Sequence, residues 1–530
     1  MNRRFYIRAG IALLIATLAT LYFSYGRSQV AANSFSVSSI LSSHNSDQPE
    51  AIGISRGNPA ALQVGCSTPS FAQAFTSPES VGPDAHYVGV GYINSDTHLD
   101  IVTTDNDSAS LTILLGDGTG DFTVTASSPF PVGSGPITVE IGDFNEDNKS
   151  DLVVTNEGSA SLSVLLGNGD GTFVNAPGSP ITVGTFPRGV AIGNFNGDSH
   201  SDLIVTNGGS DNVSILLGIG NGTFANAPGS PFASGDAPFH AVVGNFNGDA
   251  NADLAIALLG DGAVRIFLGN GNGTFTQAGL QIPVGTFTSF LALGDFNGDT
   301  NQDLAAVNRI SANMVILLGN GSGGFSQAPA SPYNTGSAPM VVAAADLNFD
   351  GKIDLAVANE SNANTFVYLG NGNGTFGPPT TLTKGQLPTH LAIADFNEDN
   401  RPDIATSDAG DNTVTILLNT CNACLPITVN PMPISSGTVG SSYSQSFSAN
   451  GATAPYTFSL TGTLPAGLTF SDPVLSGTPT QSGSFPITIT ATGSDGCTGS
   501  RNFTLVINCQ TITVDPTTIS SGPVGVAYSQ

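Results

Sequence analysis

The sequence predicts an all-β protein, with a seven-bladed β-propeller closed by an N-terminal outer strand and followed by a small β-sandwich. Three observations support this prediction. A nine-residue acidic pattern occurs seven times at a spacing of about fifty residues. Short apolar runs bounded by Gly, Asn and Asp lie around every copy, without helical periodicity. After residue 424 the pattern changes, and a segment there returns 85 residues later.

The acidic copies start at residues 92, 143, 194, 245, 295, 346 and 395. In the second copy, residues 137–141 lead into the acidic pattern and 152–155 lead out of it. Residues 161–166 then reach a Gly-rich turn at 167–171, and 172–173 begin a further extended stretch. Four short strands per repeat are typical of a propeller blade. A β-solenoid is the alternative, but its turns are usually shorter and its ends need caps.

Positions 1, 3, 5 and 9 of each copy carry oxygen-bearing side chains, which can converge on a hard cation. The first copy has Tyr92 at position 1 and starts its candidate ligands at position 3. The candidate metal ligands are Asn94, Asp96, Asp100, Asp143, Asn145, Asp147, Asp151, Asn194, Asn196, Asp198, Asp202, Asn245, Asn247, Asp249, Asp253, Asp295, Asn297, Asp299, Asp303, Asp346, Asn348, Asp350, Asp354, Asp395, Asn397, Asp399 and Asp403.

Calcium is the expected ion, with up to one per blade. An EF-hand is excluded, because the flanks are strands and position 12 of the second copy is Val154. The alternative is that Asp and Asn only form side-chain turns. Turn chemistry rarely demands two fixed carboxylates, so seven copies with acids at positions 5 and 9 favour calcium. We expect the Tyr92 copy to bind weakest, and the copies that start with Asn194 and Asn245 to be intermediate.

The seventh copy stops at residues 419–421 without its last strand. Residues 66–78 match the missing hairpin and strand in spacing, so the N-terminal segment should complete the last blade. Cys66 and Cys421 both fall in that hairpin, and we predict a disulfide between them that holds the ring shut.

The repeated Asp-Phe-Asn-Gly-Asp loops and the Leu-Leu-Gly-Asn-Gly turns resemble FG-GAP/VCBS repeats over residues 66–421. That family forms the propeller of integrin α chains and of many exported bacterial proteins. The resemblance implies a propeller fold and, by analogy of fold alone, a role in adhesion.

The N-terminus has the order of an export signal at residues 1–32. Three Arg residues precede an apolar run at 9–23 and a small-residue stretch. Residues 33–65 form a Ser-rich linker, and residues 66–424 the propeller. We expect a secreted or cell-surface protein. An uncleaved N-terminal anchor is the second choice, because fifteen apolar residues fall short of a typical span.

Residues 425–508 have the size of a β-sandwich, and residues 509–530 repeat its beginning. The segments 464–468 and 475–479 resemble immunoglobulin-like modules found in tandem on exported bacterial proteins. Cys497 and Cys509 flank the expected final strand at 502–508, and an extended strand of that length puts them beyond disulfide reach. We predict a bond between Cys424 and Cys497, with Cys509 left over.

The net charge of −27 argues against a nucleic-acid partner. No catalytic or nucleotide-binding motif is recognised, so we expect a non-enzymatic adhesion or ligand-binding protein with a protein or glycan ligand on the propeller face. A lectin, or the non-catalytic propeller of a polysaccharide-active enzyme, is the alternative. The recurring Phe144, Phe195, Phe246, Phe296 and Phe396 should pack between blades. His240 and His390 precede their loops by five residues and could face the central channel, where ordinary packing is preferred over a metal or catalytic pair.

Overall fold

The computed structural model describes Cys66 and residues 69–383, 385–421, 427–451, 454–494 and 497–511. The predicted export signal, the linker, Cys424 and the start of the second sandwich lie outside the described residues. No helix among the described residues is long and apolar enough to cross a membrane. The chain divides into two compact units, one that holds the residues from Ser67 to Cys421 and one from Asn422 onward.

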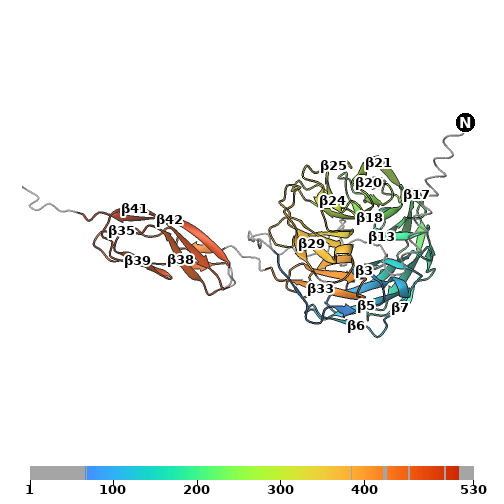
Figure 1. Cartoon of the computed structure of the whole chain (residues 1–530), viewed down its shortest axis with the longest axis horizontal. Helices are drawn as coiled ribbons and strands as arrows, with labels where there is room; N and C mark the ends of the chain where they lie inside the picture. Colours follow the sequence, from blue (N-terminus) through green and yellow to red (C-terminus); the bar gives the residue numbers. More distant parts are fainter. Residues whose placement is uncertain are drawn as a thin grey trace, which may run out of the picture. The chain divides into compact units, whose positions relative to one another are not determined.

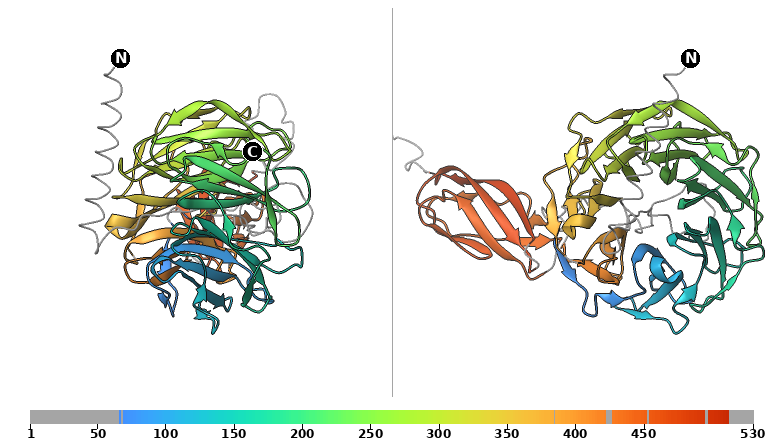
Figure 2. Two further views of the ribbon diagram at one scale, coloured as in Figure 1. Left: turned by 90° about the vertical axis from the view of Figure 1, so that its right-hand side faces the viewer. Right: turned by 45° about the vertical axis from the view of Figure 1, so that its right-hand side comes forward.

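The first unit is built from repeated antiparallel sheets of four or five strands that resemble propeller blades (Figures 1 and 2). The first sheet holds β3 (Ala85–Gly91), β4 (Asp100–Asp105), β5 (Ser110–Gly116), β6 (Phe122–Val124) and β7 (Phe130–Pro131). The second holds β8 (Pro136–Gly142), β9 (Asp151–Asn156), β10 (Ser161–Gly167), β11 (Phe173–Asn175) and β12 (Ile181–Thr182). The third holds β13 (Pro187–Gly193), β14 (Asp202–Asn207), β15 (Asn212–Gly218), β16 (Phe224–Asn226) and β17 (Phe232–Ala233).

The next sheets hold β18 (Pro238–Gly244), β19 (Asp253–Leu258), β20 (Ala263–Gly269) and β21 (Phe275–Pro283); β22 (Thr288–Gly294), β23 (Asp303–Asn308), β24 (Asn313–Gly319), β25 (Phe325–Gln327) and β26 (Tyr333–Asn334); and β27 (Pro339–Ala345), β28 (Asp354–Asn359), β29 (Asn364–Tyr368) and β30 (Thr380–Leu382). The last sheet holds β31 (Pro388–Ala394), β32 (Asp403–Asp408) and β33 (Thr413–Asn419), with β1 (Phe71–Gln73) and β2 (Glu79–Ser80) at its outer edge. Short 3₁₀ turns cover η1 (Asn106–Ser108) and η2 (Glu360–Asn362).

The sheets form a closed ring. Each first strand contacts the first strand of the next sheet, in the order β3, β8, β13, β18, β22, β27 and β31, and β31 returns to β3. The N-terminal segment completes the last sheet as predicted: Phe71 pairs with Asn419 and Glu79 with Val414. Cys66 and Cys421 are both disulfide-bonded, which supports the predicted bond across this seam.

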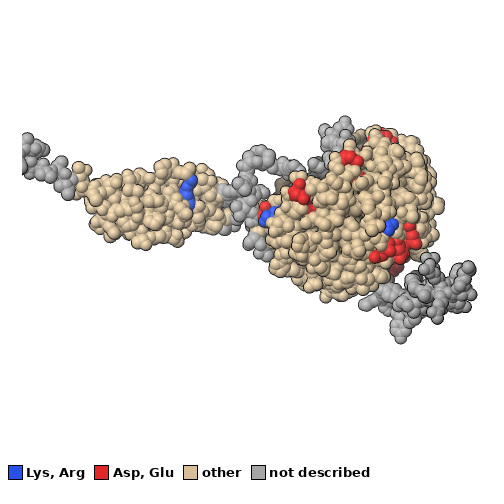
Figure 3. All heavy atoms as spheres, turned by 90° about the horizontal axis from the view of Figure 1, so that it is seen from above, with Lys and Arg blue, Asp and Glu red and all other residues tan. Residues whose placement is uncertain are grey.

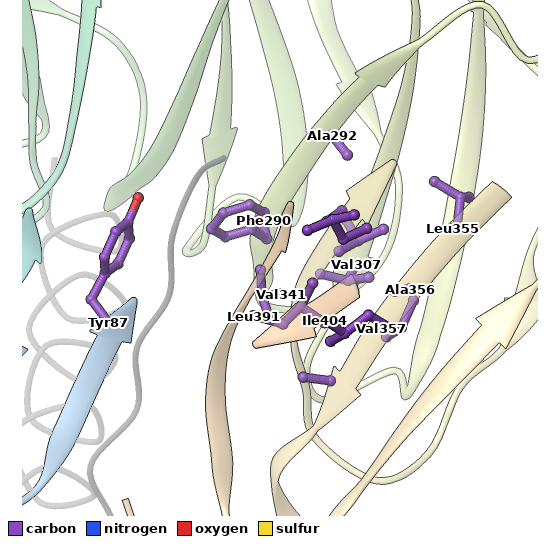
Figure 4. Close-up of a cluster of buried hydrophobic side chains, with 14 of the residues drawn as sticks. Tyr87, Phe290, Ala292, Val307, Val341, Leu355, Ala356, Val357, Leu391 and Ile404 are labelled. Atoms are coloured by element: carbon purple, nitrogen blue, oxygen red, sulfur yellow. The ribbon is translucent and has the colours of Figure 1, made fainter. Parts of the chain in front are cut away.

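The second strand of every blade is buried along its whole length, between the sheets on either side. Each of these strands begins with the position-9 Asp, and its apolar residues follow directly after it. Figure 4 shows the resulting core, where Phe290, Val341 and Leu391 reach into one cluster from β22, β27 and β31.

The predicted aromatic contacts between blades are confirmed. The Phe at position 2 of a loop meets a Phe that opens or precedes the outer strand of the following blade, edge to face, at 5.3–5.8 Å between ring centroids. The pairs are Phe144–Phe224, Phe195–Phe275, Phe246–Phe325, Phe296–Phe376 and Phe396–Phe122. The last pair joins the seventh blade to the first.

The second unit is a β-sandwich with its own core of buried residues. Its strands are β34 (Thr428–Asn430), β35 (Gly437–Thr438), β36 (Tyr443–Ser446), β37 (Ser448–Asn450), β38 (Thr457–Gly462), β39 (Leu468–Ser471), β40 (Val474–Gly477), β41 (Gly483–Thr492) and β42 (Thr498–Asn508). The final strand therefore starts four residues earlier than the predicted residue 502. Cys497 is disulfide-bonded and Cys509 is a free, exposed thiol, in agreement with the prediction that these two do not pair.

The all-β prediction, with blade-like repeats followed by a sandwich, is confirmed by these sheets.

Candidate functional site

The seven acidic loops share one place in the fold, between the first and second strand of each blade. In the second blade β8 ends at Gly142 and β9 begins at Asp151, so the first eight positions form the connection. All seven loops consequently lie at the same end of the blades. Figure 3 shows acidic side chains in several patches on this unit.

The aspartate at position 9 joins the two turns at that end of its blade. Asp151 is fully buried, and its carboxylate accepts the backbone N–H of Phe144 at 2.9 Å and that of Gly167 at 2.8 Å. The first N–H belongs to the acidic loop and the second to the end of the third strand. The same pair of bonds occurs at Asp100, Asp202, Asp253, Asp303, Asp354 and Asp403. Position 9 is thus a structural residue whatever ion the loop binds, a role that the sequence reading missed.

Burial raises the pKa of every position-9 carboxyl. The pKa reaches about 6 for Asp151, Asp202 and Asp303 and about 7 for Asp354 and Asp403, and those of Asp100 and Asp253 are also raised. Desolvation is the largest cause, and the carboxylates at positions 1 or 5 add to it, whereas the two N–H bonds oppose it. Near neutral pH each loop therefore carries ionised acids in surroundings that disfavour them, and a bound cation would relieve this.

Positions 1, 3 and 5 fold the loop around its own backbone. Asp143 accepts the N–H groups of Asp147 at 3.1 Å and Asn148 at 2.8 Å. Asn145 accepts the Asp147 N–H at 3.0 Å, and Asp147 accepts that of Lys149 at 3.0 Å. The side-chain oxygens of these positions are therefore gathered in one tight loop.

The two loops that begin with Asn differ in this respect. The Asn194 amide donates to the carbonyl oxygen of Asp198, and its side-chain oxygen accepts the N–H of Gly197. Asn245 makes the same contacts with Asp249 and Gly248. An amide group thus lies where four of the other loops have a carboxylate, so these two loops have one oxygen ligand and one negative charge fewer.

A basic residue at position 7 accompanies the position-5 aspartate in three blades. Lys149 lies 3.2 Å from Asp147 and Lys352 lies 3.0 Å from Asp350. Arg401 lies 3.3 Å from Asp399 in the seventh blade. The fourth and fifth blades have Asn251 and Asn301 at this position instead.

The donor types of these loops suit a hard cation, since carboxylate, amide and backbone oxygens are what calcium takes. Carboxylates alone do not suffice: within the described residues, no three or more His, Cys, Asp or Glu side chains are grouped so that they could hold a metal. The amide oxygens at position 3 and backbone carbonyls of the loop would have to complete the shell.

The two histidines considered as a metal or catalytic pair are buried packing residues. His240 stacks on Phe290 with 3.8 Å between ring centroids, and His390 stacks on Tyr87 at 3.9 Å. The His390 Nδ1 accepts the N–H of Val88 at 3.3 Å. Burial lowers the pKa of His240 to about 3 and also lowers that of His390, so both rings are neutral.

The opposite end of the blades has a repeated feature that the sequence did not reveal. The residue before each first strand has a left-handed backbone, with φ between 49° and 64°, and its carbonyl accepts the N–H that follows the second strand. These residues are Asp84, Gly135, Phe186, Ala237, Phe287, Ala338 and Leu387. Glycine adopts this conformation freely, whereas a large side chain does so at a cost.

Two of the residues with this unfavourable left-handed backbone are exposed aromatics. Phe186 is 52% exposed and Phe287 41%, and Ile310, in the turn beside Phe287, is 61% exposed. Arg188 follows Phe186 on the first strand of the third blade, paired with Glu157 at 3.0 Å and set over the Phe239 ring at 5.4 Å. Strained conformations tend to occur at functional sites, which makes this end of the blades a candidate ligand face.

Comparison with known families agrees with the geometry. The family model described as "FG-GAP-like repeat" matches residues 93–154, 143–205, 194–256, 246–306, 295–357 and 346–406, which together span more than half of the chain. The chain belongs to the FG-GAP-like repeat family. Residues 425–508 match a second model, He_PIG, described as "Putative Ig domain". A search of curated proteins returned no match.

Several solved structures are similar to this FG-GAP-like chain. The periplasmic gluconolactonase PpgL of Pseudomonas aeruginosa is 15% identical with a TM-score of 0.45, over 63% of this chain and 98% of that one. A functionally unknown protein from Desulfotomaculum acetoxidans is 13% identical with a TM-score of 0.43, over 60% and 98%. The extracellular domain of BT4673 from B. thetaiotaomicron is 9% identical with a TM-score of 0.41, over 85% and 60%. At these scores the neighbours add nothing on function.

Proposed function

We propose that this protein is an exported, calcium-binding β-propeller that acts as a non-enzymatic adhesion or ligand-binding protein. The observation that carries the proposal is the separation of the two ends of the blades. Seven acidic loops are gathered at one end, and exposed aromatic residues in left-handed conformation lie at the other. The repeat family, the disulfide-bonded cysteines and the Ig-like module support an extracellular location.

Calcium in this proposal is structural. It would be held by side-chain oxygens at positions 1, 3, 5 and 9 and would neutralise the crowded carboxylates of each loop. The fifth loop, which has a carboxylate at position 1 and no basic residue at position 7, should gain most. A calcium ion at a hundred times its dissociation constant stabilises the folded state by about 2.7 kcal/mol per site.

Thermal unfolding of the full chain, in 10 mM calcium and in chelator, tests the metal sites. We expect a clear rise of the propeller midpoint with calcium. Asp299→Asn removes the position-5 carboxylate of the fifth loop and should reduce this rise while changing the chelator midpoint little. Asp261→Asn, an exposed acid at the opposite end, is the matched control. Equal midpoints with calcium and chelator would refute calcium binding.

The ligand face is tested separately. Binding of the full chain to immobilised collagen, fibronectin and polysaccharides should fall when both Phe186 and Phe287 are replaced by Ser, with calcium present throughout. Because both rings are partly exposed, the double variant should fold. Retained binding by a folded double variant would place the ligand elsewhere.

A further inference from the structure

The sandwich presents a regular array of hydroxyl and amide side chains on one face of its larger sheet. Strand β41 lies between β38 and β42 in this sheet (Figure 1). The pairing registers place nine side chains in three rows, namely Thr457, Thr492 and Thr498; Ser459, Thr490 and Ser500; and Thr461, Thr488 and Asn502. These nine residues are called the hydroxyl face below.

Successive side chains of a strand point to opposite faces of the sheet, so the hydroxyl face lies on the side away from the core. Ile487, Ile489 and Phe503 point into the buried cluster, whereas the hydroxyl-face residues of β38 and β42 are exposed and those of the central β41 are half-buried. Neighbouring strands lie about 4.8 Å apart, and next-but-one residues about 6.7 Å apart along a strand. The hydroxyl face therefore offers hydrogen-bonding groups at regular intervals in two directions.

The side chains of this face are already ordered by bonds to one another. Thr490 and Ser500 share a hydrogen bond of 2.7 Å, and Thr488 donates to the Asn502 amide oxygen at 2.9 Å. A hydroxyl has one donor and two acceptor sites, so each retains capacity for an external partner. Side chains fixed before binding lose less entropy when a ligand arrives.

The charge of the module narrows the class of ligand. Residues 427–511 contain three charged residues, Asp472, Asp495 and Arg501, and none of them belongs to the hydroxyl face. The chain as a whole carries 40 Asp and Glu against 13 Lys and Arg. An uncharged surface with many hydrogen-bond donors and acceptors complements an uncharged ligand that also has many donors and acceptors. An anionic ligand would be repelled by the net negative charge of the chain.

We propose that the hydroxyl face binds a neutral polysaccharide, which lies across β38, β41 and β42. This site is separate from the acidic loops and from the proposed ligand face of the propeller. It gives the Ig-like module a binding role of its own.

The test uses the full chain and three insoluble neutral polysaccharides: microcrystalline cellulose, chitin and starch granules. Depletion from solution is measured in 5 mM calcium, and again with 0.5 M NaCl. We expect retention on at least one matrix, with little effect of salt, because no ion pair contributes. The variant T488V/T490V/S500A keeps shape and strand propensity but loses three hydroxyls, and its affinity should fall at least tenfold.

Thr469→Val is the matched control, since Thr469 is exposed on β39 in the other sheet. It should bind as the unmodified protein does, and all variants should unfold at similar temperatures. The proposal is overturned if no matrix retains the protein, if the triple variant binds as tightly as the control, or if salt abolishes binding. It is also overturned if the triple variant alone loses an oligomeric state, because the face would then join two copies of this chain. None of these outcomes depends on calcium in the propeller.

Discussion

Replacement of Asp408 by Asn should make the protein more stable above neutral pH. Asp408 ends β32 and is fully buried; its carboxylate accepts the hydroxyls of Thr415 at 2.6 Å and Thr406 at 3.0 Å. A protonated carboxyl needs no positively charged partner, and burial raises the pKa of Asp408 from 3.8 to about 7. Four other blades carry Asn at the equivalent position, namely Asn156, Asn207, Asn308 and Asn359.

The sign and size of the effect follow from the pKa. A raised pKa in the folded state means that stability is complete below pH 4, near the unfolded value, and falls steadily as the pH rises from 4 to about 7. Three pKa units correspond to about 4 kcal/mol, and relaxation of the buried site reduces what is measured. Asp408→Asn removes this loss, so we expect a gain of about 1–4 kcal/mol at pH 8 and less than half of that gain at pH 5.

Urea unfolding at pH 5 and pH 8, with calcium fixed at 5 mM, measures the difference. Asp261→Asn is the control, because it removes the same charge from an exposed site in another blade. Both variants keep the acidic loops unchanged, so these loops titrate alike in both. The difference between the two free energies of unfolding therefore reports on Asp408. A variant at Asp408 with the same pH dependence as the control would refute the reasoning.

Three further outcomes are expected. Cys421→Ser should lower the free energy of unfolding by about 2–5 kcal/mol through loss of ring closure, as measured in urea, and should leave Cys66 reactive with a thiol reagent. Ser179→Ala removes the hydroxyl that accepts the Val164 N–H at 2.9 Å and should cost about 1–3 kcal/mol by the same assay. A double-mutant cycle with Phe195→Leu and Phe275→Leu should show a coupling of about 1 kcal/mol, whereas additive effects would contradict an edge-to-face contact between blades.

The sequence predicted those parts of the fold that repeat with the acidic pattern. Its constant spacing placed the first three strands of each blade, and the incomplete seventh copy identified the strand near Phe71 that closes the ring. The aromatic at position 2 was correctly assigned to packing between blades, because an exposed turn gives no other reason for a recurring Phe. The metal ligands stay a prediction, since loop geometry alone is compatible with turns.

Features that depend on a three-dimensional contact were missed. The recurring Ser-Pro step looks like an ordinary turn, yet its Ser hydroxyl accepts an N–H from the third strand in five blades, at Ser77, Ser128, Ser179, Ser230 and Ser331. The left-handed residue before each first strand has no common side chain, so no pattern marks it. His240 and His390 could be placed on the first strand, but their neutral, stacked state depends on aromatics from the next blade.

The acidic loops also connect neighbouring blades. The carbonyl of Phe144 accepts the N–H of Gly222, from the hairpin of the following blade, at 2.7 Å, and the same contact recurs at Phe195, Phe246 and Phe296. The adjacent ring of each Phe packs on the aromatic that follows that hairpin. A cation that fixes positions 1, 3 and 5 would therefore also fix position 2 and, through it, the next blade. Loss of calcium should then weaken contacts between blades before it unfolds any single sheet, because the strand pairing within a blade does not involve the loop.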